Sequence, residues 1–144
     1  MKNLTASIDI TIRFSETDAM GVVWHGNYLK FFEDAREEFG TKYGIEYLDF
    51  YNNGFFTPIV KSNINHKASV YYGQKIRVDI RLIKSEAAKL MFEYQVINLD
   101  TNEVAALGST LQVFLQVTDR LLELNKPEFF INWENKQNWE NTEK

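Results

Sequence analysis

The sequence predicts an α+β fold in which an antiparallel sheet of five strands curls around one long helix. Three observations support this class: an alternating strand pattern comes first, one amphipathic helix pattern follows, and four further strand patterns fill the second half. Because the helix pattern carries many aromatic residues, we expect the sheet to cover most of its apolar face. The 144 residues are expected to form a single domain (1–144), with a core over about residues 7–118 and a polar tail over residues 127–144.

The first strand is expected over residues 7–14, where polar and apolar side chains alternate without a break. The helix is expected over residues 28–43, because apolar residues recur there at intervals of three and four: Tyr28, Phe31, Phe32, Ala35, Phe39 and Tyr43. Asn27 is the expected N-cap of this helix, and Gly44 is its expected C-terminal stop.

The second half of the chain reads as strands. Residues 55–66 form one candidate, in which Pro58 favours a strand start or an edge position, and residues 75–82 alternate perfectly. The last two strands are marked by Phe92, Tyr94 and Val96, and by Leu111, Val113, Leu115 and Val117. Gly108 suggests a bulge in the final strand, and short connections near residues 85–87 and 100–102 favour antiparallel hairpins.

Composition argues against several classes of function. The net charge of −4, without a basic stripe, argues against a nucleic-acid partner. The chain has no cysteine, and its two histidines, His25 and His66, match no metal-ligand spacing, so we expect neither a metal nor a cofactor. We expect a cytoplasmic protein without a membrane partner, because no apolar run resembles a signal peptide or a membrane span.

The chemistry is expected in residues 16–28, between the first strand and the helix. Asp18 lies a few residues before a helix N-terminus, where unpaired N–H groups and the positive end of the helix dipole favour developing negative charge. A carboxylate beside such an oxyanion site suggests acyl transfer or hydrolysis. The competing interpretation is that Asp18 only caps a turn before Gly21.

Residues 14–36 resemble the signature of the 4-hydroxybenzoyl-CoA thioesterase family. The resemblance rests on Asp18, the run Gly-Val-Val-Trp-His-Gly-Asn-Tyr at residues 21–28 and the run Phe-Phe-Glu-Asp-Ala-Arg at residues 31–36. Residues 57–60, 63–65 and 68–74 are similar to later segments of the family, so the likeness spans about residues 8–118. It implies a hotdog fold and an acyl-CoA thioesterase that yields a free acid and CoA, with Asp18 as nucleophile or water-orienting base.

The resemblance also implies roles for other residues. The backbone N–H groups of His25 and Gly26 are expected to form the oxyanion site, whereas the His25 side chain either joins the chemistry or only bonds to the backbone. Tyr28, Thr57 and Asn63 are candidate substrate contacts, each with the alternative of an ordinary core or strand residue. Four apolar residues are expected to line the acyl site: Phe14, Trp24, Phe31 and Phe55. Three lysines are candidates to meet the CoA phosphates, each with the alternative of an ordinary solvated side chain: Lys61, Lys67 and Lys75.

A homodimer or homotetramer is expected, because the strand near Phe55 looks like an edge that needs protection. The active site would then lie between subunits. A thiol leaving group has a pKa of about 8.5 and needs little help from a general acid, so a single carboxylate suits a thioester better than an ester or an amide. Two alternatives remain: a hydratase or dehydratase on the same fold, and a non-catalytic module that binds acyl thioesters.

Overall fold

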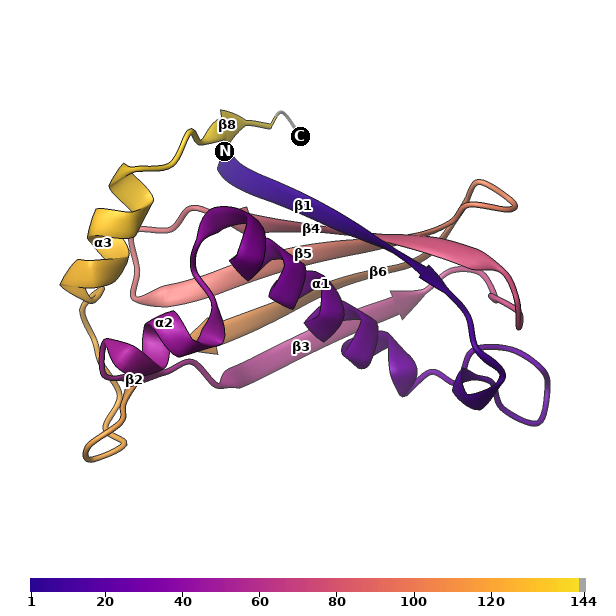
Figure 1. Cartoon of the computed structure of the whole chain (residues 1–144), viewed down its shortest axis with the longest axis horizontal. Coiled ribbons are helices and arrows are strands. Elements are labelled where there is room, and N and C mark those ends of the chain that lie inside the picture. Colours follow the sequence, from indigo (N-terminus) through magenta and orange to yellow (C-terminus); the bar gives the residue numbers. More distant parts are fainter. Residues whose placement is uncertain (143–144) are drawn as a thin grey trace.

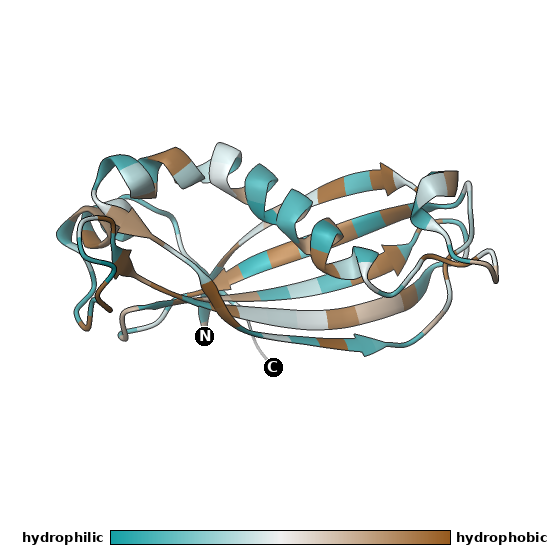
Figure 2. Cartoon of the chain, turned by 90° about the horizontal axis from the view of Figure 1, so that it is seen from below, coloured by the Kyte–Doolittle hydropathy of each residue, from teal (hydrophilic) through white to brown (hydrophobic). Residues whose placement is uncertain are grey.

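The computed structural model describes residues 1–142 and shows one long helix lying across a curved sheet (Figures 1 and 2). The six-stranded sheet has the order β3-β6-β5-β4-β1-β8, and every neighbouring pair is antiparallel. Its strands are β1 (Lys2–Thr11), β3 (Ile59–His66), β4 (Lys75–Ile83), β5 (Lys89–Asn98), β6 (Glu103–Val113) and β8 (Glu140–Asn141). A separate ribbon pairs β2 (Phe55–Phe56) with β7 (Leu115–Gln116). The helices are α1 (Asn27–Tyr43), α2 (Tyr47–Asn52) and α3 (Glu128–Asn135), and a 3-10 helix, η1, spans Phe14–Glu16.

The expected α+β class, with an antiparallel sheet against one long helix, is confirmed. The expected count of five strands and one helix is wrong, because the sheet has six strands and two short helices accompany α1. Strands β2, β7 and β8 have two residues each, and α2 has six. Segments of this length are too short for a hydrophobic period, so no pattern in the sequence indicates them.

The first strand begins and ends earlier than expected. Strand β1 covers Lys2–Thr11, because Leu4 and Ala6 extend its buried face opposite Leu82 and Ile80 of β4. The chain then bends into η1, where the Glu16 carboxylate accepts a hydrogen bond from the backbone N–H of Arg13 at 2.8 Å.

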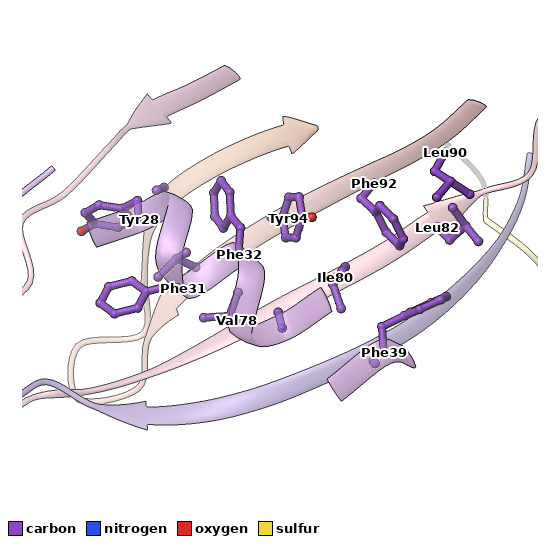
Figure 3. Packing of buried hydrophobic residues seen from close by; sticks show 14 of the residues in the cluster. Tyr28, Phe31, Phe32, Phe39, Val78, Ile80, Leu82, Leu90, Phe92 and Tyr94 are labelled. Atoms are coloured by element: carbon purple, nitrogen blue, oxygen red, sulfur yellow. The ribbon is translucent and has the colours of Figure 1, made fainter. Parts of the chain in front are cut away.

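Helix α1 buries the aromatic face that its spacing predicts (Figure 3). Phe32 stacks on Tyr94 of β5 with ring centroids 4.2 Å apart, and Phe39 meets Phe92 edge-on at 5.4 Å. Each fully buried aromatic ring of this kind contributes about 1.5–3 kcal/mol to folding. The helix stops as expected at Gly44, whose φ of +68° is a left-handed conformation that glycine adopts without strain.

The expected N-cap is wrong by one residue. Gly26 is the N-cap, without a side-chain cap, and Asn27 is the first helical residue. The Asn27 side chain instead donates a hydrogen bond to the backbone carbonyl of Glu16 at 2.8 Å. The first turn of α1 therefore keeps an uncapped end.

Strand β6 turns a different set of residues toward the helix than its apolar residues suggest. Thr110 and Gln112 are buried on the α1 side, whereas Leu111 and Val113 are half-buried on the opposite face. The expected bulge at Gly108 is also wrong, because Gly108 pairs regularly with Tyr94 and Ile64.

The candidate strand over residues 55–66 divides into β2 and β3 around Pro58, and β3 forms one edge of the six-stranded sheet. At the other edge, β8 pairs with β1. The tail is therefore docked as far as residue 142: Trp133 of α3 donates a hydrogen bond from its indole N–H to the Tyr43 carbonyl at 2.7 Å. Residues 143 and 144 of the expected tail lie outside the described residues.

Over residues 1–142, no helix is long and apolar enough to cross a membrane.

Candidate active site

Asp18 lies at the start of a tight turn between η1 and α1. Its backbone N–H donates to the Val22 carbonyl at 2.9 Å, and its own carbonyl accepts from the N–H of Gly21 at 2.9 Å. Gly21 has a φ of +80°, which a residue with a side chain rarely adopts. The turn needs Gly21 for this reason.

The Asp18 carboxylate is half-buried and is held from one side. Its Oδ1 accepts a hydrogen bond from the N–H of Met20 at 2.8 Å. The turn cap of the competing interpretation is therefore present. Oδ2 has no hydrogen-bond partner within residues 1–142, so the same bond orients the carboxylate and leaves one oxygen available.

The start of α1 presents two unused backbone donors. The N–H of Trp24 donates to Glu16 and the N–H of Asn27 donates to Trp24, but those of His25 and Gly26, between them, donate to no acceptor in the described chain. They lie at the positive end of a 17-residue helix, where a negative oxygen is favoured.

Glu16 and Asn27 join the Asp18 turn to the start of the helix. The Glu16 carbonyl accepts hydrogen bonds from the Trp24 N–H at 3.0 Å and from the Asn27 side chain at 2.8 Å. The Glu16 carboxylate is buried and binds Arg13 through its backbone and its guanidinium. We call this set, Glu16 with Asn27, the latch.

The His25 side chain is exposed and lies against Trp24, with ring centroids 5.3 Å apart. Its ring nitrogens make no hydrogen bond to residues 1–142, so they are open to a ligand or to solvent. Trp24 lies over Gly26 and occupies the place of a Cβ at that position. This packing explains why residue 26 carries no side chain.

Tyr28 is buried, and burial raises the pKa of its hydroxyl. Its ring packs edge-on against Phe31 at 5.7 Å and against His66 of β3 at 4.9 Å. Tyr28 therefore fixes the end of β3 beside the start of α1.

The structure does not bring Thr57 and Asn63 to Asp18 within one protomer. Thr57 precedes β3 at the end of the molecule opposite to the Asp18 turn (Figure 1). Asn63 pairs with Ser109 on the sheet face that points away from α1. The expected acyl lining is also dispersed, since Phe14 and Trp24 are 75% and 50% exposed while Phe31 is in the core.

Sequence reasoning missed Glu16, the role of Asn27, and Gln112. Glu16 gives a weak signal three residues after Arg13, the spacing of a capping box. No group of three metal-ligating side chains occurs among residues 1–142.

The chain is similar to proteins of one enzyme superfamily. The sequence model of the thioesterase-like superfamily matches residues 12–133. A 1,4-dihydroxy-2-naphthoyl-CoA hydrolase from Thermosynechococcus vestitus is 30% identical over 111 residues, which are 76% of this chain and 75% of that protein. A putative acyl-CoA thioesterase from Bacillus subtilis, YneP, is 32% identical over 90 residues, which are 62% of this chain and only 65% of that protein.

The fold has solved counterparts. The DHNA-CoA thioesterase from Staphylococcus aureus superposes with a TM-score of 0.81 at 30% identity, over 91% of this chain and 87% of that one. The expected hotdog fold is thus confirmed, and the resemblance to 4-hydroxybenzoyl-CoA thioesterases is confirmed as far as the wider superfamily. The chain therefore belongs to the thioesterase-like superfamily, and its relatives support its assignment as a thioester hydrolase.

Proposed function

We propose that this chain hydrolyses acyl-CoA thioesters to a free acid and CoA. Asp18 acts on the thioester carbonyl carbon, either as the nucleophile or by orienting a water. The N–H groups of His25 and Gly26 bind the carbonyl oxygen as it gains negative charge. The observation that carries this proposal is the free Asp18 oxygen near a helix start with two unused donors.

The chemistry suits these groups. An ionised carboxylate can attack the carbonyl carbon or take the proton of a water that does so, after which the carbon–sulfur bond breaks. The departing thiolate is stable enough to leave without a general acid. Each backbone donor aimed at the oxyanion typically accounts for a factor of about 10²–10³ in rate.

The proposal includes a homodimer, in which two β3 edges pair about a twofold axis. Strand β3 offers unpaired backbone groups along its outer side, and such an edge is usually covered. The twofold places both α1 helices on one side of a continuous sheet, with each active site between subunits. Exposed Lys61, Lys67 and Lys75 are candidates for binding the CoA phosphates.

The test is release of free thiol from a panel of short, medium and aromatic acyl-CoAs. Asp18→Asn keeps the turn cap but lacks the charge, and Asp18→Ala lacks both. We expect each variant to lower kcat/KM by at least about 10³-fold, as for loss of a nucleophile or base.

Asp119→Asn is the matched control. Asp119 caps a turn in the same way, with its Oδ1 accepting from the N–H of Leu121 at 2.9 Å, but it lies far along the chain from α1. Its variant should keep full activity. Unchanged hydrolysis in both Asp18 variants would remove Asp18 from the mechanism. Tight acyl-CoA binding without thiol release would favour the binding module, and hydration of an enoyl-CoA would favour the hydratase.

A further inference from the structure

A cavity of about 780 Å³ lies between the C-terminal half of α1, α2 and the sheet. Its volume falls within the range of small-molecule pockets, about 300–1,000 Å³. Its inner wall is apolar and includes Phe39 of α1, Phe50 of α2, and Leu90 and Phe92 of β5, with Phe56 of β2 at one end.

The mouth of this cavity is acidic. Four carboxylates line it, from Glu33, Asp34, Glu37 and Glu46, and the one cation among its lining residues is Arg36. Arg36 is already paired with Glu33 at 2.7 Å. A ligand with its own negative charge is therefore repelled from this cavity, whereas a neutral apolar group is accepted.

A polar side chain at the cavity points to a ligand. Gln112 is 1% exposed and donates its side-chain N–H to the Thr57 carbonyl at 2.6 Å. Among residues 1–142 its Oε1 has no hydrogen-bond partner, and an unpaired buried acceptor costs about 1–3 kcal/mol. A donor inside the cavity, either a hydroxyl of the bound group or a water held beside it, supplies the missing hydrogen bond.

The position of the cavity in the protomer determines which of the two active sites it can serve in the proposed dimer. Within one protomer, Thr57 and Pro58 line the cavity just before β3, whereas His66 at the other end of β3 packs on Tyr28 of α1. Figure 1 shows the start of α1, and the loop that leads to it from β1, at this second end of β3. Eight residues of strand span about 26 Å. Antiparallel pairing of two β3 strands sets the first end of one strand beside the last end of the other.

From this placement we propose that the cavity receives the acyl group of the thioester held at the partner subunit's Asp18, and that it selects uncharged acyl groups over those that end in a carboxylate. This inference rests on the proposed hydrolysis and on the β3-paired dimer. The acyl group lies among the apolar residues, and the acidic mouth excludes acyl groups with a second carboxylate.

The specificity test compares hexanoyl-CoA with adipoyl-CoA, which have equally long chains but differ in a terminal carboxylate. We expect kcat/KM to be at least 100-fold higher for hexanoyl-CoA. The double variant Glu33→Gln, Glu37→Gln should narrow this ratio at least 10-fold, whereas Glu38→Gln, on the same helix but outside the cavity, should not change it. Equal turnover of both substrates by the unmodified protein overturns the inference, although hydrolysis itself then stands.

The second test asks which protomer supplies the cavity. Thr57→Trp blocks the half-buried rim, and Leu48→Trp blocks it from the exposed side of α2 as an independent variant. Each blocked variant and Asp18→Asn should be inactive alone toward hexanoyl-CoA. Co-expressed with different tags and purified as the mixed dimer, they should recover about half of the unmodified activity.

Recovery is expected because one of the two sites in the mixed dimer combines an intact Asp18 with an open cavity. Mixed dimers without recovered activity overturn the assignment to the partner. If the unmodified protein releases no thiol from any acyl-CoA, the proposed function fails instead. Equilibrium binding of hexanoyl-CoA and adipoyl-CoA to Asp18→Asn then still measures the selectivity of the cavity.

Discussion

At the scale of single residues, placement rather than unusual chemistry distinguishes the candidate site. Asp18 is half-buried, and its turn bond fixes one carboxylate oxygen and leaves the other without a partner among residues 1–142. The latch then sets the distance between this turn and the start of α1 through two bonds to the Glu16 carbonyl. Catalysis depends on such positioning, since an error of about 1 Å can cost about 10²-fold in rate.

Asn27→Ala tests the latch. It removes the 2.8 Å hydrogen bond from the Asn27 side chain to the Glu16 carbonyl but keeps the backbone N–H groups of His25 and Gly26 as donors. We expect kcat for hexanoyl-CoA to fall about 10- to 100-fold with little change in KM. The reason is that the Asp18 turn loses its fixed orientation to the start of α1, whereas the groups that bind the substrate are kept. Thermal unfolding should show a loss of only about 0.5–1.5 kcal/mol, the usual contribution of one hydrogen bond.

The control for this prediction is Asn132→Ala, at an exposed position on α3. It should leave kcat and KM unchanged. If Asn27→Ala lowers the melting temperature but keeps the full kcat, the latch contributes to stability alone.

At the scale of elements, aromatic side chains join α1 to β5 within the core. Phe32 stacks on Tyr94, and Gly108 of β6 leaves room for the Phe32 ring, which a Cβ would approach to 2.5 Å. The Tyr94 hydroxyl is hydrogen-bonded to Thr110 at 3.0 Å. Burial raises the pKa of Tyr94 to about 12, although the Thr110 bond acts in the opposite direction.

This pKa predicts a loss of stability in alkali. The unfolded chain releases the tyrosine proton near its ordinary pKa of about 10, whereas the folded chain keeps it until about 12. Stability is therefore complete below pH 10 and is lost as the pH rises from 10 to 12, by about 1.4 kcal/mol at pH 11. Urea unfolding at pH 9 and pH 11 should show this loss, with a smaller loss in Tyr94→Phe. Equal losses in the two proteins contradict the prediction.

The sequence predicted the long elements because they depend on local patterns, and the catalytic role of Asp18 stays a prediction. Helix α1 follows from its spacing of threes and fours, and β4 follows from its alternation. In strand β6 the regular apolar residues, such as Leu111, lie on the half-buried face, whereas Gln112 faces the helix. The apolar pattern alone therefore does not show which face of β6 is buried. The latch joins residues 11 positions apart, and the cavity is lined by residues from Glu33 to Phe130, so no local pattern indicates either of them.

At the scale of the whole molecule, the proposed active site is complete only in the dimer. In the proposed dimer, one protomer supplies Asp18 and the helix start, and β3 pairing brings these groups to the other protomer's cavity. Val60 on β3 is 58% exposed despite its apolar side chain, so it is available for contact with a second copy. Assembly and activity should therefore be lost together.

Val60→Glu tests this coupling, because a charged side chain on an edge strand opposes pairing with a second edge, while the core of the protomer stays intact. We expect the mass in analytical ultracentrifugation to halve and hexanoyl-CoA hydrolysis to fall at least 100-fold, with far-UV circular dichroism unchanged. Val60→Ile, which keeps the apolar edge, should retain both the mass and the activity. A Val60→Glu protein of half the mass that keeps full activity would show that each protomer carries a complete site, and the assignment of the cavity to the partner's Asp18 would then be wrong.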